Sequence, residues 1–464
     1  MKRLIRCLSV LLILSLALGL CSCAKITNFV LDLLPDSLLG TNRNNEQQGG
    51  DSEDVPLPPP GGTSHAMESE AAKDAPDIEF EDLATVEAIS TSLDTVLYNG
   101  AMALEAEIDV SSFGLTADTI RQPMTQFLLL HPDLFYVGTQ YSMSTNSVTG
   151  VVQRVALTYL NTASEVSAMR STYNAAVNAI VSGIPSGATE FDKILYLHDY
   201  FVQHFTYDYA GLHAGTPIRD AYRFLTGGTG VCQAYALALM ATARAAGLEC
   251  LPVVSEPIQH AWNLIKIDGA WYHIDVTWDD PGGETMPVYP TYISYENFLL
   301  SDEALFRSDE LRQKGWDATY HASTTTYDNV VWRSADTPIL RRGDNYYCML
   351  YDTSGVGAGH LALYRGTLTE MTSVYDFATG GWGYRAAWST LCDYKGQLLF
   401  NTAHSLCLYD EDLNIPHQLI DFDTTLAGKK IYGICSVASD GTVTYVVAED
   451  YMGEYATETW KLPS

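Results

Sequence analysis

Hydrophobic and polar positions change period several times over residues 81–183. Apolar residues recur at helical spacing over 82–101 and 162–184, which predicts two helices. Residues 135–145 and 151–160 instead alternate apolar and polar positions, and they predict the two strands of a hairpin. This mixture of periods predicts an α+β lead-in domain over 81–183, and no candidate site falls in it.

Residues 184–310 are expected to form a second α+β domain, the core. It opens with an amphipathic helix over 187–205. The apolar stripe of this helix consists of Ile194, Leu197, Phe201 and Phe205. His198 lies beside the stripe, and we interpret it as a structural histidine.

A helix rich in small residues then begins at Cys232, and two β-rich runs follow it. The runs are "HAWNLIKIDG" (260–269) and "WYHIDVTWDD" (271–280). Asp268-Gly269 stands between them, and this dipeptide favours a tight hairpin turn. We therefore expect the two runs to pair as antiparallel neighbours.

Short strands separated by turns are expected over residues 320–464. Turn dipeptides such as Lys395-Gly396 and Asp440-Gly441 punctuate this part of the chain, and the pattern recurs at roughly 45 residues. It predicts an all-β repeat domain, either propeller-like or a sandwich. Its aromatic residues, which include Tyr346, Tyr347, Trp382 and Tyr384, are interpreted as core rather than as a ligand site.

Residues 1–23 have the pattern of an export signal. Basic residues precede an apolar run from Cys7 to Leu20, and small residues follow it. The "LCSC" end resembles the lipobox of bacterial lipoproteins, which implies lipidation of Cys23, with Cys21 as the alternative. We expect a lipoprotein at the cell membrane, facing outward. Plain secretion and a single-pass anchor stay open.

Residues 24–80 are expected to form a disordered tether, because residues 41–80 have almost no large apolar side chains. The net charge of the whole chain is −30. Loss of the three basic residues of the signal would change −30 to −33. This excess of acidic residues argues against nucleic acid as a partner.

Cys232 follows three glycines, Gly227, Gly228 and Gly230, at the predicted first turn of a helix. Glycines permit a sharp entry to the helix, and its free amides and dipole favour a thiolate there. The alternatives are that Cys232 is a packing residue of the core or a zinc ligand. A disulfide to Cys250 is excluded if the helix is continuous, because the two residues would lie roughly 27 Å apart along it.

His260 and Asp275 lie on the two β-rich runs. Counting outward from the Asp268-Gly269 turn places His260 nearly opposite residue 276 or 277, and a shift of one or two residues puts Asp275 beside it on the same face of the predicted hairpin. We expect the Asp275 carboxylate to accept a hydrogen bond from Nδ1 of His260, which leaves Nε2 for a thiol. His273 is a rival base, since it lies two residues before Asp275.

These blocks, "GxGVCxxYAxAL", "GLxCxxV" and "HAWNxIxIxGxWYHIDVTWDD", resemble the transglutaminase-like superfamily in its bacterial exported form, over residues 190–306. The resemblance implies a papain-like α+β core with no metal and no cofactor. It assigns Cys232 as nucleophile, His260 as base and Asp275 as the orienting carboxylate. The supporting positions that it implies are Tyr207, Asp208, Trp262, Asn263, Thr277 and Trp278. His273 then has a supporting or merely structural role.

Gln233 is a further supporting position. Gln233-Ala234 is a small departure from the pattern, because many relatives have a glycine before "YA". We expect a surface-anchored thiol enzyme that acts on peptide or carboxamide bonds through a thioester. Hydrolysis is favoured over cross-linking, with protein or peptidoglycan peptides as substrates. The alternative is a non-catalytic module that binds glycan or protein at the cell envelope. The oligomeric state stays open.

Overall fold

The computed structural model describes residues 91–255, 258–280, 282, 291–308, 320–335, 337–352, 360–376, 390–422, 425–449 and 453–463. The expected signal (1–23), the tether (24–80), Cys21, Cys23, Trp382 and Tyr384 lie outside these residues. All described residues belong to one compact unit, Val55–Ser464. None of their helices is long and apolar enough to cross a membrane.

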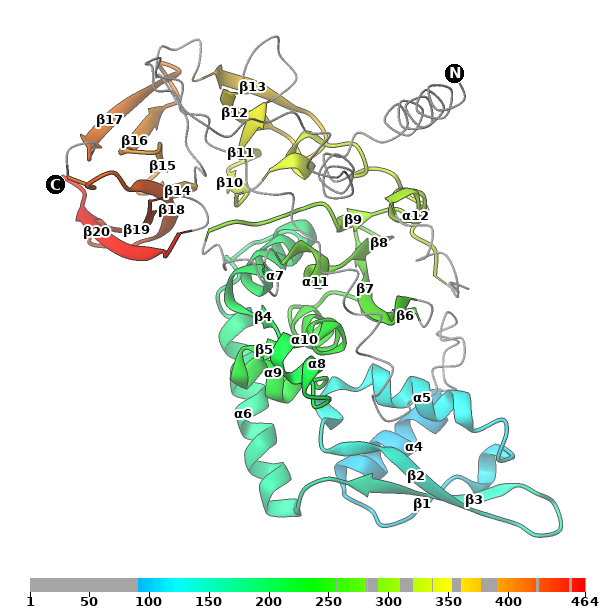
Figure 1. Ribbon diagram of the computed structural model, residues 1–464. Coiled ribbons are helices and arrows are strands. Elements are labelled where there is room, and N and C mark those ends of the chain that lie inside the picture. Colours follow the sequence, from blue (N-terminus) through cyan, green and yellow to red (C-terminus); the bar gives the residue numbers. More distant parts are fainter. Residues whose placement is uncertain are drawn as a thin grey trace, which may run out of the picture. The chain divides into compact units, whose positions relative to one another are not determined.

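The lead-in part combines helices with a three-stranded antiparallel sheet of order β1-β3-β2 (Figure 1). Its elements are α4 (Thr91–Met102), β1 (Ile108–Asp109), η3 (Ser111–Phe113), α5 (Arg121–Leu130), η4 (Pro132–Leu134), β2 (Val137–Thr145), β3 (Val152–Tyr159) and α6 (Ala163–Val181). A capping box between Thr162 and Glu165 satisfies the first amides of α6. The hairpin predicted from alternating residues is β2–β3.

The core part packs helices against a four-stranded antiparallel sheet of order β6-β7-β8-β9. Its helices are α7 (Glu190–His204), α8 (Tyr209–His213), α9 (Ala221–Gly227), α10 (Cys232–Ala245), α11 (Val276–Asp279) and α12 (Asp302–Ser308). Its strands are β4 (Thr206–Tyr207), β5 (Thr229–Gly230), β6 (Cys250–Ser255), β7 (His260–Ile267), β8 (Ala270–Ile274) and β9 (Phe298–Leu300). Helix α10 contacts β6 and β7 on the sheet and α6, α7 and α9 among the helices.

Alanine explains why α10 can lie so deep in the core. Ala234, Ala236, Ala238 and Ala243 are all buried. Small side chains let the helix axis approach the sheet and the neighbouring helices closely, while each alanine still favours the helical backbone. The end of α10 that carries Cys232 is thereby held against β7.

The β7–β8 hairpin has the turn that its sequence predicts. Asp268 and Gly269 both have positive φ, 51° and 81°, as a two-residue turn of the I′ type requires. The register pairs Ile267 with Ala270 at the turn and Asn263 with Ile274 farther along. His260 therefore stands at the open end of the hairpin, near the residues that follow Ile274.

In the C-terminal part, the residues that the structure describes after the 3-10 turn η6 (Val331–Ser334) form strands and their connections. The first meander has β10 (Leu340–Arg342), β11 (Asn345–Asp352), β12 (His360–Gly366) and β13 (Met371–Asp376). The second has β14 (Leu391–Tyr394), β15 (Gln397–Asn401), β16 (Ser405–Asp410) and β17 (Ile415–Asp421). The third has β18 (Lys430–Val437), β19 (Thr442–Ala448) and β20 (Ala456–Lys461).

Each of these meanders pairs its strands in chain order as an antiparallel sheet. The mixed α+β class with a C-terminal all-β part is therefore confirmed. The boundaries of the domains stay a prediction. Tyr346 and Tyr347 are buried, as expected for core aromatics.

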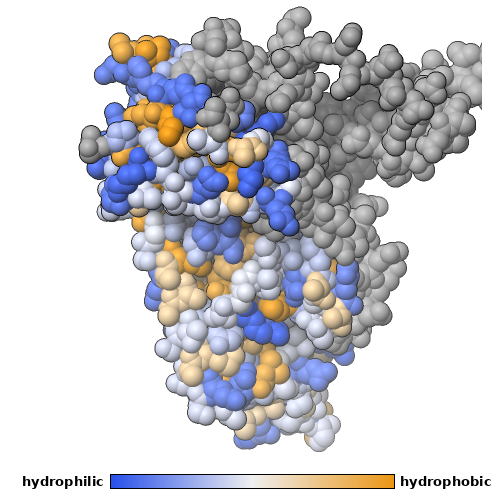
Figure 2. All heavy atoms as spheres, turned by 60° about the vertical axis from the view of Figure 1, so that its left-hand side comes forward, coloured by the Kyte–Doolittle hydropathy of each residue, from blue (hydrophilic) through white to orange (hydrophobic). Residues whose placement is uncertain are grey.

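The surface of the described residues mixes hydrophilic and hydrophobic side chains. Figure 2 shows hydrophilic and hydrophobic residues interspersed on the coloured part of one face. Among the large apolar side chains that are exposed, Val148, Leu160 and Leu413 are exposed by more than half. Single exposed apolar residues of this kind are common on protein surfaces.

The approach to α10 depends on Gly230, and this dependence can be tested. A Cβ at Gly230 would lie 2.6 Å from Cδ2 of Phe224 and 2.8 Å from Cβ of Ala234. We expect Gly230→Ala to lower the free energy of unfolding by about 1–3 kcal/mol through overpacking. Urea unfolding measures the change.

Gly227→Ala is the matched control, because a Cβ there meets nothing within 4 Å. It should leave the urea midpoint nearly unchanged. If both substitutions had the same effect, close packing at Gly230 would not be the reason for its glycine.

Candidate active site

Cys232 is the first residue of α10, directly after the N-cap residue Val231. The first amides that bond back within the helix are those of Ala234 and Tyr235, both to the carbonyl of Val231. The amides of Cys232 and Gln233 thus lie outside the helical ladder, at the positive end of the helix dipole. This is a suitable place for a thiolate and for an oxyanion next to it.

The sulfur-bearing residue lies against the strand that carries the histidine. Cys232 is buried and forms one apolar cluster with Ala236 and with Ala261, the residue next to His260. Tyr207 of β4 is half-buried and packs against the same cluster. Tyr207 is held there because β4 pairs in parallel with β5, where it lies beside Gly230.

His260 and Asp275 form a buried hydrogen-bonded pair, with 2.7 Å between Nε2 of His260 and Oδ2 of Asp275. His260 begins β7, and Asp275 follows the last residue of β8 and caps α11. The other carboxylate oxygen, Oδ1, accepts a hydrogen bond from the amide of Trp278. Strand pairing and a helix cap therefore fix the same carboxylate.

The ring nitrogen that binds Asp275 is Nε2, so the expectation that Nδ1 would do so is wrong. Nε2 is at the tip of the imidazole, and the carboxylate beyond the end of β8 meets it there. Because Nε2 donates its proton to the carboxylate, Nδ1 is the basic nitrogen of the neutral ring. Nδ1 is bonded to Cγ and lies nearer the β7 backbone than Nε2 does, and Cys232 packs against Ala261, the next residue of that strand.

Two tryptophans stack with the ring of His260. The centroid of Trp278 lies 4.7 Å from that of His260 at an angle of 19°, and the centroid of Trp262 lies at 5.8 Å and 18°. These contacts restrict rotation of the buried imidazole. Both tryptophans were implied as supporting residues by the sequence resemblance.

His273 supports Trp262. The indole Nε1 of Trp262 donates to Nδ1 of His273 at 3.0 Å, and Nε2 of His273 lies 2.9 Å from a carboxylate oxygen of Asp302. An indole can only donate, so Nδ1 of His273 has no proton and the ring is the Nε2–H form. His273 therefore binds Trp262 and Asp302, and its geometry fits the supporting role.

The remaining implied positions hold the elements together. The side-chain amide of Asn263 donates to the carbonyl of Ala236 at 2.9 Å and ties β7 to α10. Asp208 caps α8 through the amide of Gly211. Thr277 is buried within α11. Gln233 is half-buried beside Cys232.

His198 is part of a second buried charge network, which the sequence pattern did not reveal. Its Nδ1 lies 2.9 Å from Oδ1 of Asp199, and its Nε2 lies 3.1 Å from Oδ2 of Asp279. Burial lowers the pKa of His198, but the bonds to Asp199 and Asp279 outweigh it and raise the pKa to about 9. Both ring nitrogens of His198 thus face carboxylate oxygens, an arrangement that favours the imidazolium form, while burial raises the pKa of Asp199.

Asp279 connects this network to Asp275. It is the last residue of α11, and its Oδ1 accepts hydrogen bonds from the amide and the side chain of Asn297. The carbonyl of Asn297 accepts a hydrogen bond from the amide of Asp275. The single turn of α11 is therefore fixed at both ends. The adjacent acidic residues Asp279 and Asp280 in "TWDD" are the sequence signal that could have indicated this network.

The second aspartate of that pair, Asp280, is also buried. Burial raises the pKa of Asp280 to about 7, although hydrogen bonds from Tyr235 and from the amide of Gly282 act in the opposite direction. The Tyr235 hydroxyl donates to Oδ2 of Asp280 at 2.6 Å. Tyr235 lies one turn after Cys232, so this bond links α10 to the end of α11.

A disulfide and a metal site were the alternative roles for Cys232. Cys232 and Cys250 are both free thiols, so a disulfide between them is excluded. Burial raises the pKa of Cys250 to about 12. Within the described ranges, no group of three or more His, Cys, Asp or Glu side chains is arranged to hold a metal ion.

Similar proteins were found by sequence and by structure. A family model for the transglutaminase-like superfamily matches residues 177–276, a range that contains Cys232, His260 and Asp275. The kyphoscoliosis peptidases of Homo sapiens and Mus musculus are each 25% identical over 171 residues, which is 33% of this chain and 26% of theirs. The chain thus matches about a quarter of the length of these curated relatives.

Among solved structures, a transglutaminase (described as a TGase) is 16% identical with a TM-score of 0.22, covering 32% of this chain and 47% of its own. The match to the family model contains α10, β6, β7 and β8 and ends one residue after Asp275. Residues 177–276 of this chain are thus similar to the core of the transglutaminase-like superfamily.

Proposed function

We propose that this chain is an exported, surface-anchored thiol enzyme that hydrolyses peptide or carboxamide bonds through a thioester. The observation that carries the proposal is the buried 2.7 Å bond between His260 and Asp275, on a strand that packs against Cys232. The curated relatives are named peptidases, which supports hydrolysis over amine transfer. The lipoprotein-like pattern of residues 1–23 supports the location.

The arrangement supplies each proton that the reaction needs. Nδ1 of His260 takes the proton of the Cys232 thiol, and the sulfur attacks the substrate carbonyl carbon. The carbonyl oxygen becomes an oxyanion, which the amides at the start of α10 can bind. When the carbon–nitrogen bond breaks, the imidazolium returns the proton to the leaving amine. A thioester remains on Cys232.

Water completes the cycle. His260 removes a proton from the water, and the resulting hydroxide attacks the thioester carbonyl. The carbon–sulfur bond breaks, the acid leaves, and Cys232 regains its proton. The carboxylate of Asp275 stabilises the imidazolium in both halves of the reaction without changing its own protonation. We propose exposed proteins or peptidoglycan peptides as the substrates.

His198 is a positioning residue in this scheme. Its positive charge holds Asp279 at the end of α11, and α11 begins at Asp275. Loss of that charge would leave Asp279 as a buried carboxylate without its cation, which is costly in a low-dielectric interior. The orientation of Asp275 therefore depends on a histidine that lies on another helix.

The reactivity of Cys232 tests the nucleophile. At about pH 6, Cys232 should react with iodoacetamide at least about tenfold faster than Cys435, an exposed thiol of the same chain, because His260 can take its proton. Peptide mapping by mass spectrometry separates the cysteines. Cys250 should stay unmodified in the folded protein. Equal rates for Cys232 and Cys435, or a Cys232 rate that is unaffected by His260→Ala, would contradict the mechanism.

The Asp275→Asn substitution tests the orienting carboxylate and the choice of reaction. An asparagine can present its amide protons to Nε2, which moves the imidazole proton to Nδ1 and removes the base. We expect about a 10³-fold loss of kcat. Cleavage of dimethylcasein, measured as new amino groups, reports hydrolysis, and incorporation of dansylcadaverine reports amine transfer.

Asp302→Asn is the matched control, because Asp302 binds His273 rather than His260. It should lower kcat by less than about tenfold. A larger loss with Asp302→Asn than with Asp275→Asn would assign the base to His273. Dansylcadaverine incorporation in place of cleavage would make the enzyme a transferase. The absence of both reactions, with an unreactive Cys232, would favour the binding module.

Stability against pH tests the His198 network. The folded-state pKa of about 9 exceeds the unfolded value of 6.5, so the stabilisation is complete below about pH 6.5 and is lost as the pH rises through 9. His198→Gln should cost about 3 kcal/mol near pH 6 and progressively less toward pH 9.5. Urea unfolding at both pH values measures it.

His204→Gln is the control for this measurement, since His204 is exposed near the end of the same helix. It should change the stability by the same small amount at both pH values. A His198→Gln protein whose loss of stability did not depend on pH would contradict the imidazolium assignment.

A further inference from the structure

Arg333 is a half-buried cation that lies outside the candidate active site. It belongs to η6, and its neighbour Trp332 is completely buried. The surrounding atoms lower the pKa of Arg333 to about 10, mainly by excluding water, while the carboxylates of Asp279, Asp328 and Glu296 oppose this effect. The guanidinium is therefore charged at neutral pH, and the carboxylate of Asp279 is among the charges that act on it.

The guanidinium donates to backbone carbonyls of one short segment, residues 295–299. Its Nη1 lies 2.8 Å from the carbonyl oxygen of Tyr295, 3.3 Å from that of Glu296 and 3.1 Å from that of Phe298. Its Nη2 lies 3.5 Å from the carbonyl oxygen of Leu299. A guanidinium carries five N–H groups in one fixed plane, so this single side chain can hold several carbonyls at once.

The position of Arg333 is fixed by the residues before it in the chain. Its Nε donates to the carbonyl of Asp328 at 3.2 Å, and its Nη2 also donates to the carbonyl of Tyr327. The carboxylate of Asp328 accepts hydrogen bonds from the amide and the hydroxyl of Ser301, at 2.9 and 2.6 Å. Ser301 directly follows β9, so Arg333 is tied to the end of the core sheet.

The segment that Arg333 binds contains a β-bulge. The consecutive residues His273 and Ile274 of β8 pair with residues 300 and 298 of β9, so Leu299 is the extra residue. Leu299 is completely buried and has a φ of 55°, a left-handed conformation that is costly for a bulky side chain. Such a conformation persists only where neighbouring groups determine it, and the guanidinium is one of these groups.

Asn297 connects this segment to the candidate active site. Its carbonyl accepts a hydrogen bond from the amide of Asp275 at 3.1 Å. Its own amide and its side chain donate to Oδ1 of Asp279, at 2.9 and 3.1 Å. Arg333 thus holds the residues on both sides of Asn297, and Asn297 holds both ends of the single turn α11.

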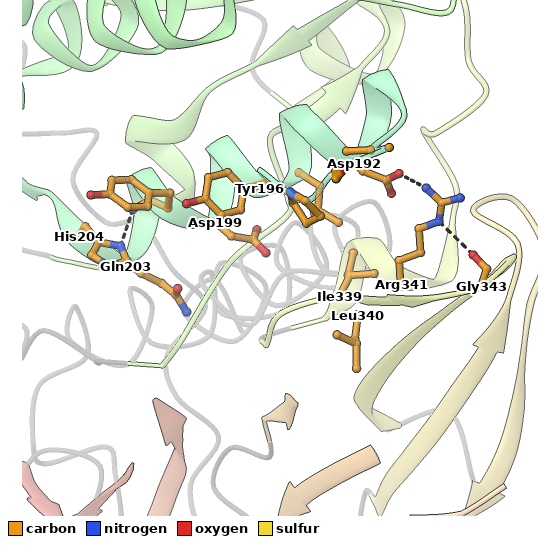
Figure 3. A pocket seen from close by; sticks show the side chains of 15 residues that line it. Asp192, Tyr196, Asp199, Gln203, His204, Ile339, Leu340, Arg341 and Gly343 are labelled. Atoms are coloured by element: carbon orange, nitrogen blue, oxygen red, sulfur yellow. Dashed lines mark hydrogen bonds and ion pairs between the residues drawn. The ribbon is translucent and has the colours of Figure 1, made fainter. Parts of the chain in front are cut away.

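The connection from η6 to β10 is anchored on α7. The amide of Ile339 donates to the hydroxyl of Tyr295 at 3.2 Å, and this hydroxyl donates to Oδ1 of Asp199 at 3.0 Å. Two residues farther along, Arg341 forms an ion pair with Asp192, and Figure 3 shows these two side chains pointing toward each other. The connection that begins at η6 is therefore fixed to the core at both of its ends.

We propose that Arg333 is a positioning residue for the catalytic carboxylate, an inference that rests on the proposed thiol mechanism. The guanidinium holds segment 295–299, Asn297 holds the amide of Asp275, and the Asp275 carboxylate is thereby kept on Nε2 of His260. Arg333 touches neither the substrate nor the reacting atoms. It also lies beyond residue 276, where the match to the family model ends, so the family pattern does not indicate it.

Arg333→Lys tests the proposal, because lysine keeps the positive charge and loses the planar fork. We expect kcat for dimethylcasein cleavage to fall about tenfold or more, since a small displacement of a catalytic group is sufficient for such a loss. KM should change by less than about twofold. Circular dichroism and urea unfolding verify that the variant is folded at the assay temperature. An unchanged kcat would overturn the proposal.

The proton between His260 and Asp275 gives a second readout, which does not require activity. In protein that carries isotope-labelled histidine, NMR detects this Nε2–H as a low-field signal, identified by its absence in His260→Gln. Folded Arg333→Lys should lose the signal, because a displaced carboxylate no longer protects the proton from exchange with water. A signal that stayed unchanged would overturn the proposal. If the unsubstituted protein showed the signal but no cleavage, the hydrolytic function would be wrong, and the signal alone would decide the role of Arg333.

Arg341→Lys is the matched control, because it makes the same change at the other end of the connection, where the partner is Asp192. It should leave both kcat and the low-field signal unchanged. Equal effects of Arg341→Lys and Arg333→Lys would assign the loss to the attachment of the first meander, and this outcome would overturn the specific role of Arg333.

Asn297→Ala keeps the proposal testable even if the Arg333→Lys protein does not fold. It removes the side-chain bond to Asp279 and leaves every backbone carbonyl of the segment in place. It should lower kcat about threefold. Where both variants fold, the combined variant should be no less active than Arg333→Lys alone, because residues that act as one unit are not additive. Full additivity, or an Asn297→Ala protein with unchanged kcat and signal, would contradict the proposed path.

Discussion

The bond between His260 and Asp275 is the interaction on which the rest of the core depends. Both groups are almost completely buried, and a buried carboxylate is stable only when a partner compensates its charge. The pair requires the β7–β8 turn, the open end of that hairpin and the start of α11 to meet at one point. The alanine-rich face of α10 then allows Cys232 to lie beside the same strand.

Neighbouring side chains restrict this pair. Trp262 and Trp278 stack on the imidazole, and His273 holds Trp262 from behind. The His198 network holds the far end of α11. In the proposed mechanism two histidines have different tasks: a charged His198 fixes a helix, whereas His260 exchanges its proton.

The sequence was informative where a local pattern determines geometry. The β-rich runs and Asp268-Gly269 predicted the hairpin, and counting from the turn placed Asp275 within one or two residues of the position opposite His260. The ring nitrogen was assigned wrongly, because strand register does not determine side-chain torsion angles. The partner of His198 was missed because Asp279 lies 81 residues away.

The short segment from Asp275 to Asp279 carries a constraint on length as well as on composition. Its first carboxylate meets a histidine from β7, and its last meets a histidine from α7. One inserted residue would rotate the second carboxylate by about 100° around the helix axis, away from its partner. Insertions and deletions should therefore be tolerated less well here than in any exposed loop of the core, even where every functional side chain is retained.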